Sequence, residues 1–485
     1  MTPLLATFLC LAFVGYLFWI DLRKGDGPSQ GLWVPLLWMF FAGSRYASSW
    51  LGLSPTFVSA SDYVEGSPID RAIFFGLIAA GLVILGRRKA DWARVLTDNW
   101  WIALYFLFCL ASSSWSDDPL VVAKRWIKEI GNVVMVLVIL TDPRPYEALG
   151  AVLRRLSFLL LPLSVLFIKY YPALARDFKP DGTPMYTGVG HQKNELGLMC
   201  LMASVYMLWE FIRRSDKAHP TFVRQHAIIS VVFAAMILWL LMMSDSKTPV
   251  VCLVAAFFVL VLGRLKFAAR NPSRVILIIA ILVPLIWFLD EVVDIKATAF
   301  SLLGRDPTLT NRTEVWKLVS TFAGNPIVGV GFMSFWTGER MNLIWRAVGP
   351  GINQAHNGYL EQFLNLGYIG LIFTIGIMVA ALIHISRCMK QDMWVGLLRL
   401  SLVAIAALYN ITEASFYGLN NMWVLLLLAA IEVKPTPTVR SGAVPAIRQV
   451  IGQARIVFRV QQPLLGRERI GAAPKGAPAF RRPQV

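Results

Sequence analysis

Apolar runs close to membrane-spanning length recur along the whole sequence, and they constrain its fold more than any other feature. A helix needs about 20 mostly apolar residues to cross the hydrocarbon core of a bilayer. Only 15% of the residues are charged, against about 25% in soluble domains. We therefore predict an all-α integral membrane protein with about 12–13 transmembrane helices. Clear examples of such runs lie at 3–20, 72–85, 226–243, 275–289 and 369–385.

The placement of positive charge predicts which ends of these helices face the cytoplasm. Twenty Lys and Arg lie in one set of connecting segments, at 21–30, 86–98, 141–155, 213–226, 264–274 and 386–399. Fourteen lie in the alternate set, at 52–71, 115–128, 172–194, 244–248, 290–357 and 413–421. Because short cytoplasmic loops are enriched in Lys and Arg, we expect the first set in the cytoplasm. The second set is then periplasmic, in a bacterial inner membrane.

The charge pattern also divides the chain into a polytopic membrane domain, 1–432, and a basic tail, 433–485. The tail carries ten Lys and Arg and one acid, Glu468. Apolar residues within 447–458 follow helical spacing, with arginines on the other side. This pattern suits a helix lying on the anionic cytoplasmic leaflet, and a disordered cytoplasmic tail is the alternative. The membrane domain has one large periplasmic loop, 290–357.

That loop contains signals for short amphipathic helices. In TLTNRTEVWKLVSTFAGNP the apolar residues are three or four apart. This spacing predicts a helix that starts near 310–313 and ends before Gly324-Asn325-Pro326. GNPIVGVGF then indicates a glycine-rich turn. NGYLEQFLNLGYIG begins a second helix that continues into the next span, with Asn357 as its predicted N-cap.

Several basic residues lie beside apolar runs on the predicted outer side. They are Lys124, Arg125, Lys128, Lys193, Lys247 and Arg312. Charges so close to a membrane are costly, and they often serve a function. If the helices pack together, these residues form a cationic cluster. Such a cluster suits a diphosphate, because each phosphate oxygen accepts charge-assisted hydrogen bonds.

Each of these cations also has a purely structural interpretation. Lys124 and Lys128 can extend to lipid phosphates. The other two lysines can pair with nearby Glu195 and Asp245, and Arg312 can brace its own helix through neighbouring carbonyl groups. Charge placement alone therefore does not show that a bound anion is a substrate.

His356, in AHNGYL, is the candidate general base. Imidazole has an ordinary pKa of about 6.5, so its neutral form can accept a hydroxyl proton. The start of a helix favours that neutral form. A capping or packing role is the alternative. His191, among glycines, is a second candidate or only lines its loop. The remaining histidines fall on the predicted cytoplasmic side: His219, His226 and His384.

Polar residues at the outer end of the penultimate span complete the candidate set. Glu413 and Asn410 lie in YNITEASFYGLNN. A carboxylate there can orient an imidazole or pair with an arginine, and a solvated role is equally compatible with the sequence. The five cysteines all lie inside or beside apolar runs. They indicate neither a disulfide framework nor a metal cluster.

Three stretches of the chain carry motifs in a characteristic order: SDSKTPVVCLVAAFFVLVLGR, TNRTEVWKLVSTFAGNPIVGVGFMSFW and AHNGYLEQFLNLGYIGLIF. The order is that of a small-residue S-x-S-R segment, an R-x-x-x-W helix before N-P-x-x-G-x-G, and A-H-N-x-Y-L before L-G-x-x-G. Residues 240–385 thereby resemble the O-antigen ligase/Wzy polymerase superfamily. Lys193-Asn194-x-Leu196-Gly197 and GRDPTLTNRTEVW are similar to its exopolysaccharide-production polymerase branch.

The resemblance implies a glycosyl transfer at the periplasmic face. The donor would be an oligosaccharide on undecaprenyl diphosphate, an acceptor hydroxyl would attack the anomeric carbon, and the lipid diphosphate would leave. His356 matches the family's presumed base. The diphosphate-binding basic residues correspond to Lys247 and, more loosely, to Lys193, and Arg312 matches the arginine of the loop helix. Much of the family has arginine in place of Lys247; lysine keeps the charge but loses the bidentate fork.

Beyond these residues, the predicted substrate-binding set includes Asn194, Arg125, His191, Asn357 and Glu413. Such a reaction can run without a metal, and the sequence has neither a D-x-D pair nor an H-E-x-x-H motif. We therefore predict no metal and no cofactor. The predicted partners are the lipid-linked oligosaccharide, membrane lipids and proteins of polysaccharide export and chain-length control. Nucleic acid is not among them.

Two other functions remain open from the sequence. A ligase of the same family would move a finished glycan onto lipid A-core or a protein, and only the acceptor distinguishes it from a polymerase. A transporter of lipid-linked sugars is the third interpretation. Transporters often have repeated halves and a site at the middle of the membrane. This chain shows no repeat, and its unusual polar residues collect in loops on one side.

Overall fold

The computed structural model describes residues 1–23, 27–53, 67–178, 182–216, 224–265, 312–349 and 352–434, with single positions between 268 and 276. Over these residues the chain is almost entirely helical, and seven helices are long and apolar enough to cross a membrane. An eighth span arises if the bent pair α6 and α7 counts as one. The predicted all-α integral membrane fold is confirmed. The predicted span at 275–289 and the tail helix lie outside the described residues.

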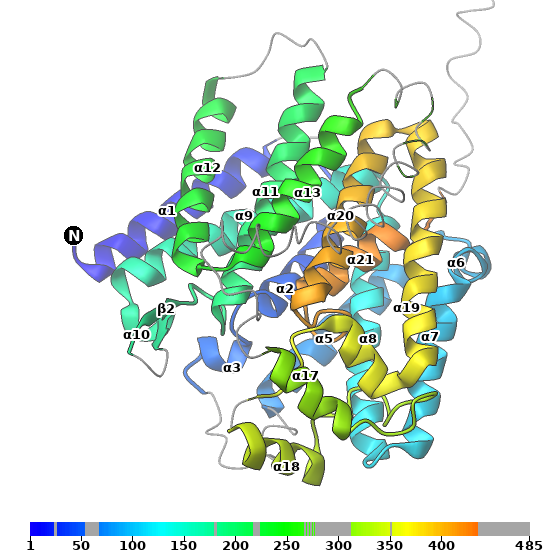
Figure 1. Cartoon of the computed structure of the whole chain (residues 1–485). Coiled ribbons are helices and arrows are strands. Elements are labelled where there is room, and N and C mark those ends of the chain that lie inside the picture. The colour runs from blue at the N-terminus through cyan, green and yellow to red at the C-terminus, as the bar shows by residue number, and fades with distance from the viewer. Residues whose placement is uncertain are drawn as a thin grey trace, which may run out of the picture. The chain divides into compact units, whose positions relative to one another are not determined.

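The first half of the chain contributes helices to both sides of the bundle, from the blue helix at the left of Figure 1 to the cyan helices at the right. Its helices are α1 (Pro3–Leu22), η1 (Gln30–Leu32), α2 (Trp33–Ala42), α3 (Ala47–Trp50), α5 (Pro68–Gly86), α6 (Trp92–Asp98), α7 (Trp100–Ala111), η2 (Ser112–Trp115), α8 (Pro119–Leu140), α9 (Pro145–Tyr170) and α10 (Pro172–Ala175).

The second half begins with a small hairpin and continues with helices. These are β1 (Arg176–Phe178), β2 (Pro184–Tyr186), α11 (Lys193–Asp216), α12 (Arg224–Ser244), α13 (Lys247–Leu262), α17 (Arg312–Thr321), α18 (Gly338–Val348), α19 (Gly358–Gln391), α20 (Met393–Thr412) and α21 (Asn421–Ala430). The hairpin is antiparallel, with Asp177 opposite Met185. The sequence analysis treated this stretch as loop, because three-residue strands give too short a pattern to recognise.

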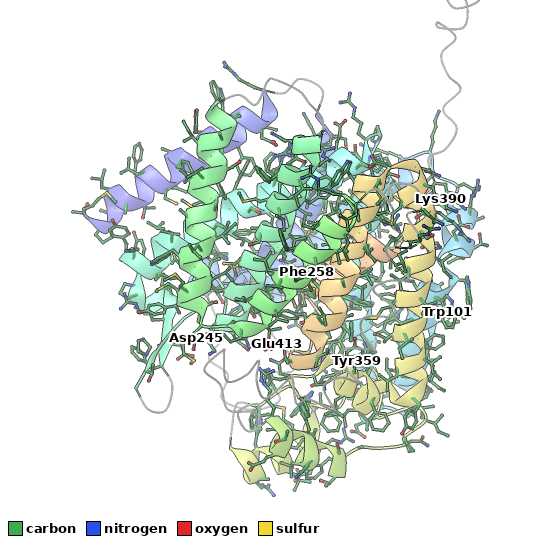
Figure 2. All side chains as sticks on the ribbon, turned by 45° about the horizontal axis from the view of Figure 1, so that its top comes forward. Trp101, Asp245, Phe258, Tyr359, Lys390 and Glu413 are labelled. Carbon is green, nitrogen blue, oxygen red and sulfur yellow. The ribbon has the colours of Figure 1, made fainter. Side chains whose placement is uncertain are left out.

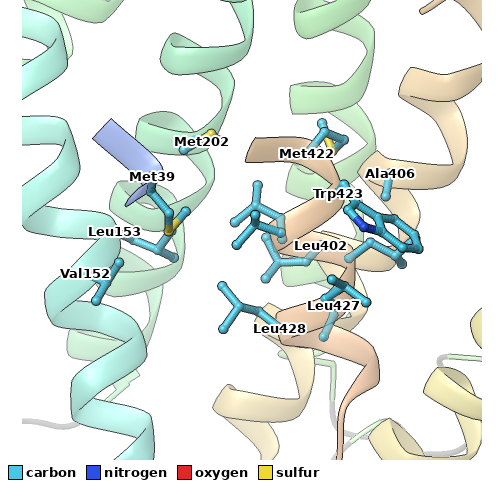
Figure 3. Packing of buried hydrophobic residues seen from close by; sticks show 14 of the residues in the cluster. Met39, Val152, Leu153, Met202, Leu402, Ala406, Met422, Trp423, Leu427 and Leu428 are labelled. Carbon is cyan, nitrogen blue, oxygen red and sulfur yellow. The ribbon is translucent and has the colours of Figure 1, made fainter. Parts of the chain in front are cut away.

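Helix α9 lies at the centre of one half of the bundle, in contact with α1, α2, α8, α11 and α12. Helices α20 and α21 hold a similar position in the other half, and nearly all of α21 is buried. Figure 3 shows Leu402, Trp423 and Leu427 packing closely in this region. Lipid tails are as apolar as these side chains, so close van der Waals packing rather than water exclusion holds such helices together.

Part of the predicted periplasmic loop forms a small layer at one end of the bundle (Figure 1). Helix α17 begins at Arg312 and ends at Thr321, which confirms the helix predicted there. Helix α18 was not predicted, although it follows the same principle. Its Met341 and Ile344 are three residues apart and fully buried, whereas Arg346 is exposed. Both helices pack on a separate apolar cluster that includes Phe335.

Helix α19 starts where the sequence predicts, because the Asn357 side chain accepts hydrogen bonds from the backbone N–H groups of Tyr359 and Leu360. Its course then breaks at Gly367, whose φ is +62°. At this break the N–H of Tyr368 donates to the carbonyl oxygen of Pro326 at 2.8 Å. The predicted glycine-rich turn after α17 therefore docks into a gap in the following span, an arrangement that periodicity alone did not reveal.

Candidate functional site

The carboxylate of Glu413 is the meeting point of four chain segments. It follows α20 directly, and the residue is only 5% exposed. Its Oε1 accepts hydrogen bonds from Asn194 Nδ2 at 2.8 Å and from Arg312 Nη2 at 3.0 Å. Its Oε2 lies 3.2 Å from Nδ1 of His356. We call these four residues the Glu413 cluster.

His356 is held in an unusual backbone conformation beside this carboxylate. Its φ is +50°, in the left-handed region that most side chains avoid. The next two residues fix it there: Asn357 caps α19, and the N–H of Gly358 donates to the carbonyl oxygen of Glu413 at 2.9 Å. A Cβ at Gly358 would lie 2.1 Å from the side chain of Asn410, so this approach requires glycine.

A second buried carboxylate anchors the same loop from the other side. Glu361, one turn into α19, is fully buried. It accepts hydrogen bonds from the N–H of Ala355 at 2.5 Å, from Trp336 Nε1 at 2.8 Å and from the hydroxyl of Tyr417 at 2.6 Å. Glu361 was not among the predicted site residues. Its position in the first turn of a helix, five residues after a candidate base, was the available signal.

The contact with Glu413 fixes which nitrogen of His356 is available for chemistry. A carboxylate is only an acceptor, so the favourable neutral tautomer carries its proton on Nδ1 and directs it at Oε2. The lone pair of Nε2 is then available to accept a proton. The side chain is 33% exposed, so a partner from outside the bundle can reach it. If the ring becomes protonated, the same carboxylate stabilises the cation.

Arg312 makes two contacts at the end of α20, and its predicted role in binding the substrate stays a prediction. One guanidinium nitrogen donates to the carbonyl oxygen of Thr412, which is a bracing contact, and another binds Glu413. The loop helix α17 is thus attached to the end of α20. Glu413 contacts both the imidazole of His356 and the guanidinium of Arg312, the two kinds of partner that the sequence allowed for it.

Two lysines of the predicted set share one exposed carboxylate near this cluster. Nζ of Lys193 and Nζ of Lys247 each lie 3.9 Å from an oxygen of Asp245, whose side chain is 60% exposed. Lys247 thus takes the alternative partner foreseen for it, and Lys193 pairs with Asp245 rather than with Glu195. Exposed pairs of this length are weak, roughly 0–1 kcal/mol. An incoming anion can therefore compete for both ammonium groups.

These lysines are tied to the Glu413 cluster through their neighbours. Asn194 Oδ1 accepts a hydrogen bond from the hydroxyl of Ser246 at 3.2 Å, and the hydroxyl oxygens of Thr248 and Thr412 lie 2.7 Å apart. The starts of α11 and α13 therefore lie beside the end of α20. Figure 2 shows Asp245 and Glu413 near the same end of the bundle.

Arg125 and His191 sit apart from this arrangement. Arg125, on α8, donates to the carbonyl oxygen of Met333 in the loop between α17 and α18. The ring of His191 packs against Tyr46 with centroids 5.3 Å apart. Burial and the nearby Arg45 lower the pKa of His191, while Asp70 acts weakly in the opposite direction. This lowering of the pKa favours the neutral form of the ring, and the predicted contact of His191 with the substrate stays a prediction.

Metal ligands are not grouped anywhere in the part of the chain that the structure describes. No cluster of three or more His, Cys, Asp or Glu side chains there is arranged to hold an ion. The Glu413 cluster itself offers one carboxylate and one imidazole, together with the guanidinium of Arg312. Its chemistry is that of a base next to cations.

The fold and the site together define a class: an all-α, multi-pass membrane protein with a histidine hydrogen-bonded to a buried glutamate at one end of its bundle. Residues 229–375 match the family model described as O-antigen ligase. The chain is also 25% identical, over 327 residues, to the exopolysaccharide production protein ExoQ of Rhizobium meliloti (strain 1021). That match covers 64% of this chain and 70% of the relative. The predicted resemblance to the O-antigen ligase/Wzy polymerase superfamily is confirmed.

Proposed function

We propose that this protein is a membrane glycosyltransferase that joins oligosaccharide repeat units carried on undecaprenyl diphosphate into exopolysaccharide. The observation that carries the proposal is the contact of 3.2 Å between His356 Nδ1 and Glu413 Oε2. It orients a neutral imidazole with one nitrogen left to accept a proton. The family match and the similarity to an exopolysaccharide production protein supply the reaction class.

The reaction needs a base for the acceptor and cations for the leaving group. The acceptor hydroxyl gives its proton to Nε2 of His356 as its oxygen bonds to the anomeric carbon of the donor. The bond from that carbon to the diphosphate oxygen breaks, and its electron pair leaves with the diphosphate. Positioned base catalysis contributes typically about 10²–10⁴-fold to a rate. Glu413 stabilises the imidazolium until its proton passes to water.

Lys247 and Lys193 are the proposed ligands of the diphosphate. Their shared partner Asp245 is exposed, so exchanging it for a phosphate group leaves no buried charge unpaired. Arg312 is already engaged by Glu413, and we propose that it adds positive potential and holds the loop helix over the site. Asn194 and Asn357 position the histidine and its carboxylate. Neither Arg125 nor His191 belongs to this proposed centre.

The proposed setting is a bacterial inner membrane with the Glu413 cluster facing the periplasm. The membrane domain would span 1–432, with its ligase-like core at 240–385, and the basic tail 433–485 would be cytoplasmic. The proposed partners are the lipid-linked oligosaccharide, membrane lipids and proteins of chain-length control and export. The excess of Lys and Arg in the alternate short segments supports this orientation.

A ligase is the second candidate, because the matching family model is that of an O-antigen ligase. The donor, the base and the leaving group would be the same. The acceptor would be lipid A-core or a protein instead of another repeat unit. Lipid-linked intermediates that accumulate in a strain without the protein separate the two: single repeat units indicate a polymerase, whereas long unattached chains indicate a ligase.

The direct test is His356→Ala, expressed in a strain lacking the chromosomal copy. Removing the base should reduce polymer formation by about 10²-fold or more, while the membranes contain the protein at its normal level. The matched control is Lys317→Ala, which removes an exposed cation from α17 at a position outside the Glu413 cluster. Polymer yield and lipid-linked intermediates are measured for both.

Wild-type polymer yield from His356→Ala would refute the assignment of the base. Loss of polymer in both variants would indicate a structural effect of the loop rather than a catalytic one. A transporter would keep moving its cargo without this histidine, so unimpaired transport of the lipid-linked sugar in His356→Ala would favour that third function.

A further inference from the structure

A cavity of about 740 Å³ lies among α1, α9, α11, α12 and α13. Residue positions along helix α11 show how far the cavity extends from the Glu413 cluster. Asn194, in its first turn, contacts Glu413, and Glu210, which lines the cavity, is 16 residues later. At 1.5 Å per residue this is roughly 24 Å along the helix axis. The end of the cavity at Glu210 therefore lies toward the opposite end of the bundle, whereas its walls at Leu241 and Leu253 are four and six residues from Asp245 and Lys247.

Most of this cavity is apolar and open to the side of the bundle. Phe158, Phe233, Leu238 and Phe257 are among its walls. Its volume falls within the range of about 300–1,000 Å³ that is usual for pockets holding small molecules. Leu238 is 63% exposed, so the surroundings of the cavity are the hydrocarbon of the membrane. An alkyl chain is the chemistry that such walls accept. We call this space the apolar chamber.

One end of the apolar chamber meets a second, polar cavity of about 260 Å³. We call this the polar chamber. The two chambers share the wall formed by Asp21, Arg154, Tyr206, Glu210 and Arg214. An amphipathic molecule with an alkyl chain on one side of this wall and a charged group on the other therefore matches the pair of chambers.

The shared wall is an ion network. Asp21 accepts hydrogen bonds from Arg154 at 2.8 Å and from Arg155 at 2.7 Å. Glu210 similarly accepts from Arg213 at 3.2 Å and from Arg214 at 2.7 Å. Two carboxylates thus accept hydrogen bonds from four guanidinium groups. Because each guanidinium has five N–H donors, donors remain in this wall for a phosphate.

Two further acids give the polar chamber a balanced charge. Glu147 and Asp392 also line it, so four arginines and four acids surround the space. A headgroup with a phosphate and a primary ammonium matches this balance, since an ammonium supplies three donors to carboxylates. Glu147 already pairs with Arg144 at 3.5 Å, and Asp392 accepts hydrogen bonds from the backbone N–H groups of Trp394 and Val395. Each carboxylate still has acceptor positions for an ammonium.

The proposed donor lipid cannot place its charged group in the polar chamber, although its apolar tail is compatible with the apolar chamber. Its diphosphate must reach His356, whereas the arginine-lined wall lies toward the other end of the bundle. The polar chamber instead lies where the headgroup of a lipid from the leaflet remote from His356 would be. A bilayer phospholipid can enter the apolar chamber sideways without leaving its own leaflet.

We infer that these chambers form a binding site for one zwitterionic glycerophospholipid of the phosphatidylethanolamine class. An acyl chain occupies the apolar chamber, the phosphate contacts the arginines of the shared wall, and the ammonium faces Glu147 and Asp392. The site braces α1 and α12 against the centre of the bundle. It is independent of the glycosyl transfer proposed above.

Native mass spectrometry of the full-length protein tests the site. After delipidation, the protein is given phosphatidylethanolamine, phosphatidylcholine or phosphatidylglycerol, and retained lipid is counted. We expect phosphatidylethanolamine to bind at least about tenfold more tightly than either of the others, equivalent to about 1.4 kcal/mol. Choline lacks N–H donors, and the glycerol headgroup lacks the positive charge.

Two variants with matched controls locate the binding. Ala234→Trp fills the apolar chamber, whereas Ala235→Trp, its exposed neighbour on α12, leaves the chamber open. Arg214→Gln removes a cation from the shared wall, and Arg264→Gln removes an exposed cation elsewhere. The first member of each pair should weaken phosphatidylethanolamine binding about tenfold or more, and the second should bind as the wild type does.

Equal retention of phosphatidylcholine, or stronger retention of phosphatidylglycerol, would overturn the headgroup assignment. Unchanged binding by both Ala234→Trp and Arg214→Gln would overturn the location, and the arginine variant keeps this test valid if the tryptophan variant does not fold. If another part of the chain fills the apolar chamber, the full-length protein retains no phospholipid, and the inference also fails.

Discussion

At the scale of single residues, Glu413 is the side chain whose charge the proposed site depends on most. Glu413→Gln keeps the shape but removes the negative charge that orients His356 and neutralises Arg312. We expect polymer formation to fall by about 10²-fold or more, because the ring loses the partner that fixes its tautomer and stabilises its cation. Polymer yield and the level of protein in the membrane are the measurements.

The control for this variant is Glu314→Gln, which removes an exposed carboxylate from α17. It should leave polymer yield unchanged. If the glutamine at 413 merely loosens the fold, its thermal midpoint should fall while the remaining folded protein stays active. Normal activity of correctly folded Glu413→Gln would contradict the orienting role.

The sequence predicted most members of this site and allowed Glu413 to contact an imidazole or an arginine, but it did not show that all of them meet at one carboxylate. His356, Arg312, Asn194 and Glu413 were each identified as candidates from residue type and predicted side of the membrane. Their convergence on one carboxylate joins positions more than 200 residues apart. Such contacts depend on how helices pack, which local patterns do not encode. Glu361 was not predicted, because the sequence does not distinguish a buried acid in the first turn of a helix from a solvent-exposed one.

At the scale of elements, the break in α19 is the feature most sensitive to a single substitution. Gly367 has φ +62°, and a Cβ there would lie 2.3 Å from the carbonyl carbon of Ile327. Gly367→Ala should cost about 1–3 kcal/mol from backbone strain alone, with more from displacing the docked turn. A thermal unfolding curve of the detergent-solubilised protein should shift to lower temperature. Gly15→Ala is the control, because nothing lies within 4 Å of its Cβ position.

An unshifted curve for Gly367→Ala would mean that the turn after α17 does not dock as described. Local signals did predict the elements on either side: the cap at Asn357 and the end of α17 before Gly324 follow from residue preferences. The break itself depends on a glycine meeting the backbone of another segment. The strands β1 and β2 were not predicted for a different reason, because elements of three residues carry too little periodicity. Helix α18 has apolar residues at helical spacing, as α17 does, so its local pattern was sufficient to predict it.

At the scale of the whole molecule, the two ends of the bundle carry different groups of charged residues. The Glu413 cluster and the layer of α17 and α18 lie at one end, and the arginine-lined wall of the two chambers lies toward the other. The proposed orientation assigns the first end to the periplasm and the second to the cytoplasm. Both proposals about ligands depend on this assignment, because each lipid must come from the correct leaflet.

Single cysteines at the two ends test that orientation in intact cells. Thr321→Cys, on the exposed face of α17, should react with a membrane-impermeant maleimide that reaches the periplasm. Gln391→Cys, at the far end of α19, should react only after the cells are permeabilised. The native cysteines give little background, because four are buried and Cys10 is partly so. The reverse pattern would place the imidazole in the cytoplasm, where a periplasmic lipid-linked donor cannot reach it.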